Sequence, residues 1–356
     1  MFKRRIKNIQ IFLSEKDAVL ITSNPNRLYF TGFSSSAGDL VITKEKAFFF
    51  IDFRYFEKAK TSVDSCEVVL ITKLFSQLND LILKEKIENI FLETSSVTID
   101  FYKTLVENLE NVNISDFSGI DKKIQSLRAV KDSSEIALIK KAQEITDRAF
   151  SYILDKIKVG VTEKELALQL EFFMRKNGSE GVSFDFIVVS GKNSSLPHGV
   201  PTDKKIEYGD FVTMDFGAVV GGYRSDMTRT VAVGFASDKQ REVYNTVLSA
   251  QNAALEKIKA GGICCEIDVV SRNLISKAGY GEFFGHGLGH SVGIEIHENP
   301  AFNTRDKTVL ESGMVITVEP GIYIENEFGV RIEDMIKVTE DGIENLTKSN
   351  KELIVV

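Results

Sequence analysis

Cysteine is scarce in this chain, and its spacing excludes a framework of disulfide bonds. The 356 residues include three cysteines, an odd number, and two of them, Cys264 and Cys265, are adjacent. There is no Cys-x-x-Cys spacing either. We therefore expect buried or half-buried reduced thiols.

Long hydrophobic runs and an excess of positive charge are also missing. No stretch approaches the roughly 18 uninterrupted apolar residues that a membrane-spanning helix needs. The N-terminus carries basic residues like a secretory signal, but residues 14–17 (SEKD) break its apolar run within a few residues. The formal net charge of −7 argues against a general nucleic-acid binder, which usually has a basic face. The sequence predicts a soluble, cytoplasmic protein with neither a membrane nor a nucleic acid as partner.

Histidine is rare and unevenly distributed, because none of the four histidines lies in the first half of the chain. His286, His290 and His297 fall within twelve residues of a glycine-rich run. Such glycine density prevents a regular helix and lets the backbone approach a site closely. One histidine there would be typical of packing or surface, but three together favour a functional site. His198 follows an apolar strand in a predicted loop, where catalytic groups commonly lie.

The remaining composition, 43% hydrophobic and 27% charged, is typical of a globular protein long enough for two domains. The first part, residues 1–121, alternates short apolar runs with turn signals and predicts a small α/β domain. Its expected helices cover residues 2–13 and 75–86, and its expected strands cover residues 17–22, 39–43, 46–52 and 88–94. Residues 118–135 predict a polar connector, with Ser133 and Ser134 as candidate helix caps.

The second predicted domain, residues 128–356, has a different pattern of elements. Two helices and then two strands are expected, and the same series occurs a second time. The expected helices are residues 134–157, 162–177, 238–259 and 265–278, and the strands are 184–191, 209–217, 314–320 and 329–339. This pattern predicts two related halves that share one sheet, in a mixed α/β (α+β) fold.

Two aspartates in the stretch GDFVTMDFGAVVGGYRSDMTRT are the first candidate functional pair. Gly221 and Gly222 supply a tight turn. A hairpin centred between Val220 and Gly221 places Asp215 directly opposite Asp226. Opposed like charges are destabilising, so a positive group is expected between them.

Glu319 in VITVEPG and Glu333 in GVRIED form the second pair, at either end of a loop of about ten residues. A carboxylate at the end of an apolar strand is costly to bury unless it is paired or bound to metal. Arg331 lies on the same predicted strand face as Glu333. A structural Arg331–Glu333 salt bridge is therefore an equal alternative for Glu333.

Two aspartates, two glutamates and a histidine make an oxygen-rich ligand set that suits manganese, cobalt or zinc. Four carboxylates carry a charge of about −4, which two divalent cations would balance. Two such ions roughly 3.5–4 Å apart would bridge a water, lower its pKa and polarise a carbonyl.

At these residues the sequence resembles the pita-bread metallopeptidases, in their aminopeptidase P and prolidase branch. NRLYFTGFSSSAGDLVI and FFFIDFRY are similar to the creatinase-type N-terminal domain, and SLRAVKDSSEIALIKKA to the entry into the catalytic domain. The catalytic motifs are SGKNSSLPHG, MDFGAVVGGYRSDMTRT, GHGLGHSVGIEIHE, VEPGIY and VRIED. The similarity covers nearly the whole chain, and five motifs in this order are specific.

The resemblance implies a role for each candidate residue. The implied ligands of a dinuclear, often manganese, centre are Asp215, Asp226, His290, Glu319 and Glu333. Glu319 would also be the general base, and His198 and His297 would bind substrate and stabilise charge on the scissile carbonyl oxygen. His286 would contribute to the substrate pocket, and Arg331 would hold a ligating carboxylate in place.

The activity implied by the resemblance is hydrolysis of the N-terminal Xaa-Pro bond of a short peptide with proline in second position, by a homodimer. Within the branch, the residues Ala301 and Phe302 after HENP favour the aminopeptidase, because prolidases can carry an arginine there for the dipeptide's carboxylate. The Xaa-Pro dipeptidase, or prolidase, remains the alternative. An inactive pita-bread protein that only binds peptides is the alternative of another class, and the complete ligand set argues against it.

Overall fold

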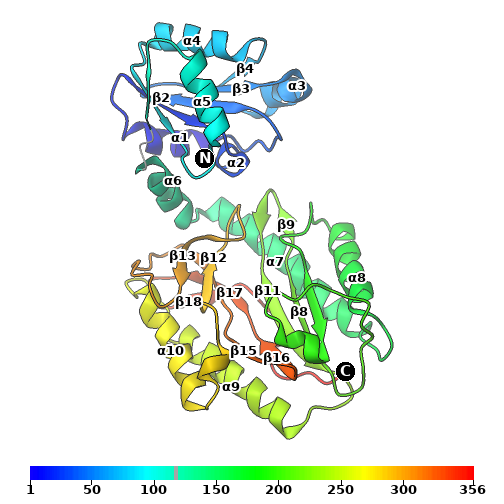
Figure 1. Ribbon diagram of the computed structural model, residues 1–356. Helices are drawn as coiled ribbons and strands as arrows, with labels where there is room; N and C mark the ends of the chain where they lie inside the picture. Colours follow the sequence, from blue (N-terminus) through cyan, green and yellow to red (C-terminus); the bar gives the residue numbers. More distant parts are fainter. Residues whose placement is uncertain (116–118) are drawn as a thin grey trace. The chain divides into compact units, whose positions relative to one another are not determined.

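The computed structural model describes residues 1–115 and 119–356, which form two compact units, Met1–Arg128 and Ala129–Val356 (Figure 1). The first unit is built on one six-stranded sheet in the order β4-β3-β2-β1-β5-β6. Its strands are β1 (Asp17–Ile21), β2 (Asp39–Thr43), β3 (Ala47–Ile51), β4 (Glu67–Leu70), β5 (Asn89–Leu92) and β6 (Asn113–Ser115). Its helices are α1 (Phe2–Gln10), α2 (Asn24–Thr31), α3 (Phe53–Ser62), α4 (Leu74–Glu85), α5 (Ile99–Asn108) and α6 (Gly119–Ala129), the last ending one residue into the second unit.

The four apolar runs predicted as strands in this part are confirmed as β1, β2, β3 and β5. The central strands are buried nearly throughout, and all five residues of β3 are buried. Strand β1 pairs antiparallel with β2 and parallel with β5, so both of its edges are hydrogen-bonded. Residues 18–21 are buried on both faces of the sheet, which explains the continuous apolar run. The mixed α/β prediction for this unit is therefore confirmed.

Two local predictions need correction. Helix α1 ends at Gln10, three residues before the predicted end at Leu13. The predicted polar connector begins at Ser118, which lies outside the described residues, and its next part is helix α6. Ile120 and Ile124, one helical turn apart, are buried, so this stretch has an apolar face that packs as a helix.

The second unit has the predicted helix–helix–strand–strand pattern twice. The first half contains α7 (Ser133–Leu154), α8 (Glu163–Lys176), β7 (Ile187–Ser190), the 3-10 helix η1 (Gly191–Ser195), β8 (Phe211–Phe216), β9 (Val219–Val220), β10 (Tyr223–Arg224) and β11 (Met227–Ala232). The second half contains α9 (Asp238–Leu255), α10 (Cys264–Lys277), η2 (Gly281–Phe283), β12 (Gly289–Ser291), β13 (Glu298–Phe302), β14 (Val315–Val318), β15 (Gly321–Ile324), β16 (Phe328–Arg331), β17 (Asp334–Val338) and β18 (Ile343–Asn345).

The sequence predicts that the two halves share one sheet, and this prediction is wrong, because the strands form separate ladders. One half has the sheet β11-β8-β7 and the other β13-β12-β14-β17-β18. One side-chain bond and one backbone bond help to join them. The Thr230 hydroxyl donates to Arg331 O at 3.0 Å, and the backbone N–H of Glu333 donates to Thr228 O at 3.1 Å. This junction brings the functional strands of both halves together.

The cap of helix α7 is Asp132 rather than Ser133 or Ser134. Asp132 has an extended backbone and accepts hydrogen bonds from the N–H groups of Ser134 and Glu135, and the Glu135 side chain accepts from Asp132 N–H. This reciprocal capping box leaves Ser133 as the first helical residue.

The three predicted free thiols are confirmed, since Cys66, Cys264 and Cys265 are unpaired. Cys264 is fully buried, and burial raises the pKa of its thiol to about 12. Over the described ranges, no helix is long and apolar enough to cross a membrane.

Candidate metal centre and active site

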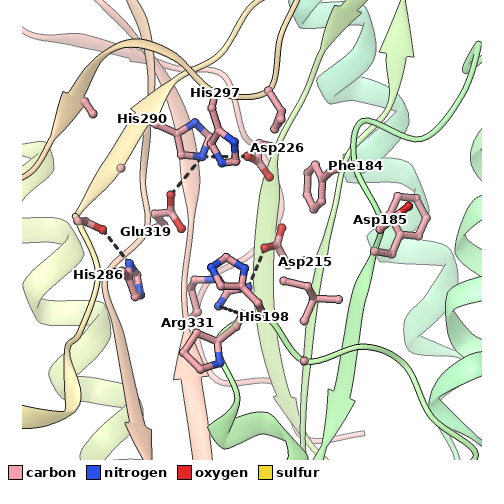
Figure 2. Close-up of a pocket in the computed structure, with 18 of the residues that line it drawn as sticks. Phe184, Asp185, His198, Asp215, Asp226, His286, His290, His297, Glu319 and Arg331 are labelled. Carbon is pink, nitrogen blue, oxygen red and sulfur yellow. Dashed lines mark hydrogen bonds and ion pairs between the residues drawn. The ribbon is translucent and has the colours of Figure 1, made fainter.

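A cavity of about 730 Å³ lies in the second unit and collects most of the candidate residues (Figure 2). Apolar side chains such as Phe184, Ile187 and Ile296 cover part of its wall. The candidate residues in its lining are His198, Asp215, Asp226, His286, His290, His297, Glu319 and Arg331. Glu333 is not part of this lining and is buried next to it, 1% exposed.

The hairpin that carries Asp215 and Asp226 has a register two residues away from the predicted one. Asp215 pairs with Thr228, not with Asp226. Gly221 and Gly222 both have positive φ, 58° and 76°, and together form the two central turn residues. The prediction of direct opposition is therefore wrong. Asp226 lies two residues before Thr228, diagonal to Asp215, and both carboxylates still face the same side.

Glu319 and Glu333 belong to a second hairpin. Val318 pairs with Asp334 in one ladder, and Gly321 pairs with Arg331 in the next. Both ladders keep the same register, so Glu319 lies opposite Glu333 in the gap between them. The loop of ten residues predicted between them is itself folded into β15 and β16. Glu319 comes directly after β14, and Glu333 directly before β17.

Three carboxylates from the two hairpins converge. One oxygen of each of Asp215, Asp226 and Glu333 lies within 4.8 Å of the others. Among the described residues, the buried atoms Asp215 Oδ1, Asp226 Oδ1 and Glu333 Oε1 have no hydrogen-bond partner. Buried oxygens without donors are costly, so these three atoms fit a bound cation.

The charge of the cluster favours the same conclusion. Burial raises the pKa of Asp226 and of Glu333 well above the ordinary carboxyl value, and neighbouring carboxylates raise both further. Burial also raises the pKa of Glu319. Such carboxylates stay ionised together only when positive charge is supplied.

His290 joins Glu319 to this cluster. Its Nε2 lies 3.4 Å from Glu319 Oε1 and 3.6 Å from Asp226 Oδ2, whereas its Nδ1 lies 3.2 Å from Ser291 O. A carbonyl oxygen only accepts, so we assign the ring proton to Nδ1. Nε2 then offers its lone pair toward the carboxylates, as a metal-binding histidine does.

Arg331 forms its ion pair with Asp215, and over residues 1–115 and 119–356 no ion pair joins it to Glu333, so the structural salt bridge that the sequence offered for Glu333 is not formed. Its Nη2 lies 2.7 Å from Asp215 Oδ2, and its Nε donates to Thr228 Oγ1 at 3.0 Å. Its Nη1 donates to Pro197 O at 3.1 Å and to Tyr323 Oη at 2.8 Å. Burial opposes its charge, but Tyr323, Asp215 and Glu319 outweigh burial and raise its pKa.

The three remaining histidines occupy different places around the cavity. His286 Nε2 lies 2.9 Å from Tyr323 Oη, and burial lowers the pKa of its ring. His297 stacks edge-on against His290, with ring centroids 4.4 Å apart, and burial lowers its pKa as well. His198 is exposed at the wall of the cavity, and Figure 2 draws it above Arg331. All four histidines of the chain thus face one cavity.

Three further residues were not singled out from the sequence. Thr228 donates to Glu333 Oε2 at 2.7 Å while it accepts from Arg331. The Thr317 hydroxyl donates to Glu319 Oε1 at 3.1 Å. Tyr323 connects His286 with Arg331. Thr228 and Tyr323 lie inside recognised motifs, MTRT and PGIY, but hydroxyls in strands carry no spacing signal of their own.

Family models cover both parts of the chain. Metallopeptidase family M24 matches residues 137–340, and the creatinase/prolidase N-terminal domain matches residues 5–130. The chain belongs to metallopeptidase family M24. The predicted pita-bread fold with a creatinase-type first domain is confirmed.

Two solved structures and one further known protein are similar to this chain over nearly its full length. An Xaa-Pro dipeptidase from Bacillus anthracis is 44% identical, with a TM-score of 0.96 and all of both chains covered. An X-Pro aminopeptidase from Thermotoga maritima is 39% identical, with a TM-score of 0.92 over 98% of this chain and 100% of the other. An Xaa-Pro dipeptidase from Pyrococcus horikoshii is 41% identical over 99% of both sequences.

Membership in this family makes the chain a hydrolase of the metallopeptidase class and implies divalent metal ions. The donor set fits them, because oxygen and imidazole ligands suit hard and borderline divalent cations. The unpartnered oxygens of Asp215, Asp226 and Glu333 are the observation that carries this fit.

Proposed function

We propose that this M24 metallopeptidase hydrolyses the N-terminal Xaa-Pro bond of short peptides, as an Xaa-Pro aminopeptidase. The observation that carries the proposal is the buried carboxylate cluster that faces a cavity of about 730 Å³. A cavity of this size accepts a few residues of a peptide. The names of the similar proteins support a proline-directed specificity.

The residues proposed to hold two divalent ions are Asp215, Asp226, His290, Glu319 and Glu333. We propose manganese, with cobalt or zinc as alternatives. When bound, two such ions make water a nucleophile near neutral pH and polarise the scissile carbonyl. Arg331 keeps Asp215 oriented, because it holds Oδ2 and leaves Oδ1 free for the cluster.

Glu319 is the proposed general base. Burial raises the pKa of its carboxyl, which suits a group that takes up and returns a proton near neutral pH. Thr317 donates to its Oε1 and holds the side chain beside His290. Unlike Asp226 and Glu333, Glu319 has no unpartnered buried oxygen within the described structure.

His198 and His297 are the proposed donors to the scissile carbonyl oxygen. Both are exposed in the wall of the cavity, so a substrate can reach them. A donor aimed at the developing oxyanion is a large contribution to catalysis. His286, fixed by Tyr323, is proposed to shape the substrate pocket.

The cavity wall supports the aminopeptidase over the dipeptidase. Arg331 is the one lysine or arginine in the described lining, and Asp215, Thr228, Tyr323 and Pro197 already use its donors. A strict dipeptidase needs a cation for the substrate's C-terminal carboxylate. The Xaa-Pro dipeptidase nevertheless stays the second candidate, because two of the similar proteins described above carry that name.

The test compares Ala-Pro, Ala-Pro-amide and Ala-Pro-Ala, with manganese and with a chelator. Ala-Pro-amide lacks the negative charge of the C-terminal carboxylate but has nearly the same size and shape as Ala-Pro. Metal-dependent cleavage that favours the tripeptide and tolerates the amide would support the aminopeptidase. Cleavage of the free dipeptide alone would establish the dipeptidase. Cleavage of other peptides but of no Xaa-Pro bond would refute the proposed specificity.

The same resemblance supports a cytoplasmic homodimer, which we include in the proposal. Analytical ultracentrifugation of the full chain is the measurement. A single species at the mass of one chain across the working concentration range would contradict the dimer.

A further inference from the structure

One buried carboxylate has no role in the proposed reaction. It binds both ends of the segment that carries His198. Glu163 is the first residue of helix α8 and is 0% exposed. It accepts hydrogen bonds from both ends of residues 190–202. We propose that Glu163 is a positioning residue, which fixes His198 in the cavity by clamping the two ends of its loop together.

The clamp uses both oxygens of the carboxylate. At the near end, Ser190 donates to Oε1 through its N–H at 2.7 Å and its hydroxyl at 2.9 Å. At the far end, Thr202 donates to Oε2 through its N–H at 3.0 Å and its hydroxyl at 2.6 Å. The Asn193 amide lies 3.2 and 3.3 Å from the two oxygens.

His198 depends on this frame because its ring has no hydrogen bond in the described part of the chain. Its position is set by its backbone. The middle of the loop is attached elsewhere, since Pro197 O accepts from Arg331 and the Ser194 hydroxyl accepts from Gly329 N–H at 2.9 Å. The loop is thus held at its ends by Glu163 and at its centre by the strand that carries Arg331.

Only a carboxylate satisfies this arrangement. Every partner of Glu163 named above is a donor, and an ionised carboxylate is the side chain that accepts at both oxygens. A glutamine would direct its own N–H groups at either Ser190 N–H or Thr202 N–H. Two donors that face each other in a buried site cannot form a hydrogen bond, so one end of the clamp would open. The N-terminus of α8 stabilises the negative charge there.

This inference rests on the role proposed for His198, and a double-mutant cycle tests it. The kcat and KM for Ala-Pro-Ala are measured with manganese for wild type, Glu163→Gln, His198→Ala and the double variant. We expect Glu163→Gln to lower kcat about 10- to 100-fold while KM changes little, because His198, the proposed donor to the scissile carbonyl oxygen, is displaced. In the His198→Ala background the same substitution should change kcat less than about twofold.

Glu165→Gln is the matched control. Glu165 lies in the same first turn of α8 and is exposed, and its carboxylate bonds to Thr162. It should leave kcat unchanged. Hydrogen exchange at residues 190–202 should rise in Glu163→Gln and stay as in wild type in Glu165→Gln. If Glu163→Gln fails to fold, Thr202→Val removes one donor from the clamp, and a smaller kcat loss that depends on His198 is expected.

Three results would overturn the clamp. They are wild-type kcat in Glu163→Gln, the same fold loss with and without His198, and wild-type kcat in His198→Ala. A failure of the proposed function is separate. A wild-type enzyme that cleaves other peptides but no Xaa-Pro bond refutes the specificity, and the cycle is then run with the cleaved peptide.

Discussion

Arg331 Nη2 lies 2.7 Å from Asp215 Oδ2, and both side chains are buried at the junction of the two halves of the catalytic unit. This pair occupies Oδ2 of Asp215, and in the part of the chain that the structure describes no donor reaches Oδ1. The position of one proposed metal ligand is therefore set by a residue on the other hairpin.

Replacement of Arg331 with lysine should lower kcat/KM and metal affinity by about 10- to 100-fold, as loss of partners of metal ligands does elsewhere. Lysine keeps the charge but cannot make the separate bonds to Asp215, Thr228 and Tyr323. Metal affinity measured by chelator competition, with kcat/KM for Ala-Pro-Ala, checks this. Arg241→Lys on an exposed helical surface is the control. Unchanged metal affinity in Arg331→Lys would contradict the role.

Metal ions should stabilise the folded protein through the carboxylate cluster. At a metal concentration of 100 times Kd, the gain is about 2.7 kcal/mol. Asp226→Asn should remove at least about 1.4 kcal/mol of this gain, which corresponds to a tenfold loss of affinity. It should also stabilise the metal-free protein, because it relieves repulsion among buried carboxylates.

Thermal unfolding with manganese and with chelator measures both effects. Asp185→Asn is the control, since Asp185 is an exposed carboxylate in the same cavity lining. An Asp226→Asn variant with the full metal-dependent gain would argue against Asp226 as a ligand.

Glu319→Gln should lower kcat by about 10²- to 10⁴-fold while the fold is kept, because the amide cannot take up the proton. The measurement is kcat for Ala-Pro-Ala alongside the near-ultraviolet circular dichroism spectrum. Glu311→Gln, on an exposed turn before β14, is the control. Full activity in Glu319→Gln would eliminate the proposed base.

The sequence was sufficient to predict most of the residues that gather at the cavity, because each candidate residue lies in a linear motif. Asp215, Glu319 and the histidines next to glycine were found in this way, and the two halves followed from the order of helices and strands. A linear motif does not specify which residues of two paired strands lie opposite each other. The hairpin prediction was wrong by two residues because Gly221 and Gly222 are both central turn residues, a choice set by backbone geometry.

Contacts between distant segments were also beyond the sequence. Thr228 serves both Arg331 and Glu333, which follow it by 103 and 105 residues. The clamp at Glu163 joins residues 27 and 39 positions away. The residues next to Thr228 and Glu163 in the sequence do not indicate these contacts. Only the folded chain shows what the hydroxyl and the carboxylate bind.

A pH-dependent contribution to stability is expected from Asp39 in the first unit. Burial raises the pKa of this carboxyl from 3.8 to about 6, while Arg27 opposes the shift. The folded state therefore binds the proton more tightly than the unfolded state. The stability that this group contributes is fully present below pH 3.8 and is lost as the pH rises through about 6.

Urea unfolding of wild type and Asp39→Asn across this range isolates the effect. Relative to Asp39→Asn, the wild type should lose about 2.4 kcal/mol between pH 4 and pH 7, at about 1.36 kcal/mol for each unit of pKa shift. Asp64→Asn, an exposed carboxylate of the same unit, should follow the wild-type profile. A constant difference between wild type and Asp39→Asn over the range would contradict the shift.

A buried ion pair beside the site gives the last prediction. Lys131 Nζ lies 3.2 Å from Glu298 Oε2, with side-chain exposures of 1% and 6%. Gly293 leaves room for this carboxylate, since a Cβ there would lie 2.6 Å from its oxygens. Lys131→Met alone removes the positive charge beside this buried carboxylate and should cost about 3–5 kcal/mol of unfolding free energy.

The double variant Lys131→Met with Glu298→Gln should recover much of that loss, because the buried carboxylate is neutralised together with the lysine. Urea unfolding of the two single variants and the double variant measures the coupling. The exposed pair Lys140–Glu344 supplies the matched control, and Lys140→Met should cost less than about 1 kcal/mol. If the losses of the two single variants simply add in the double variant, Lys131 and Glu298 make no net interaction. The position of Glu298, the neighbour of His297 in the chain, would then depend on the backbone pairing of Glu298 with Ser291.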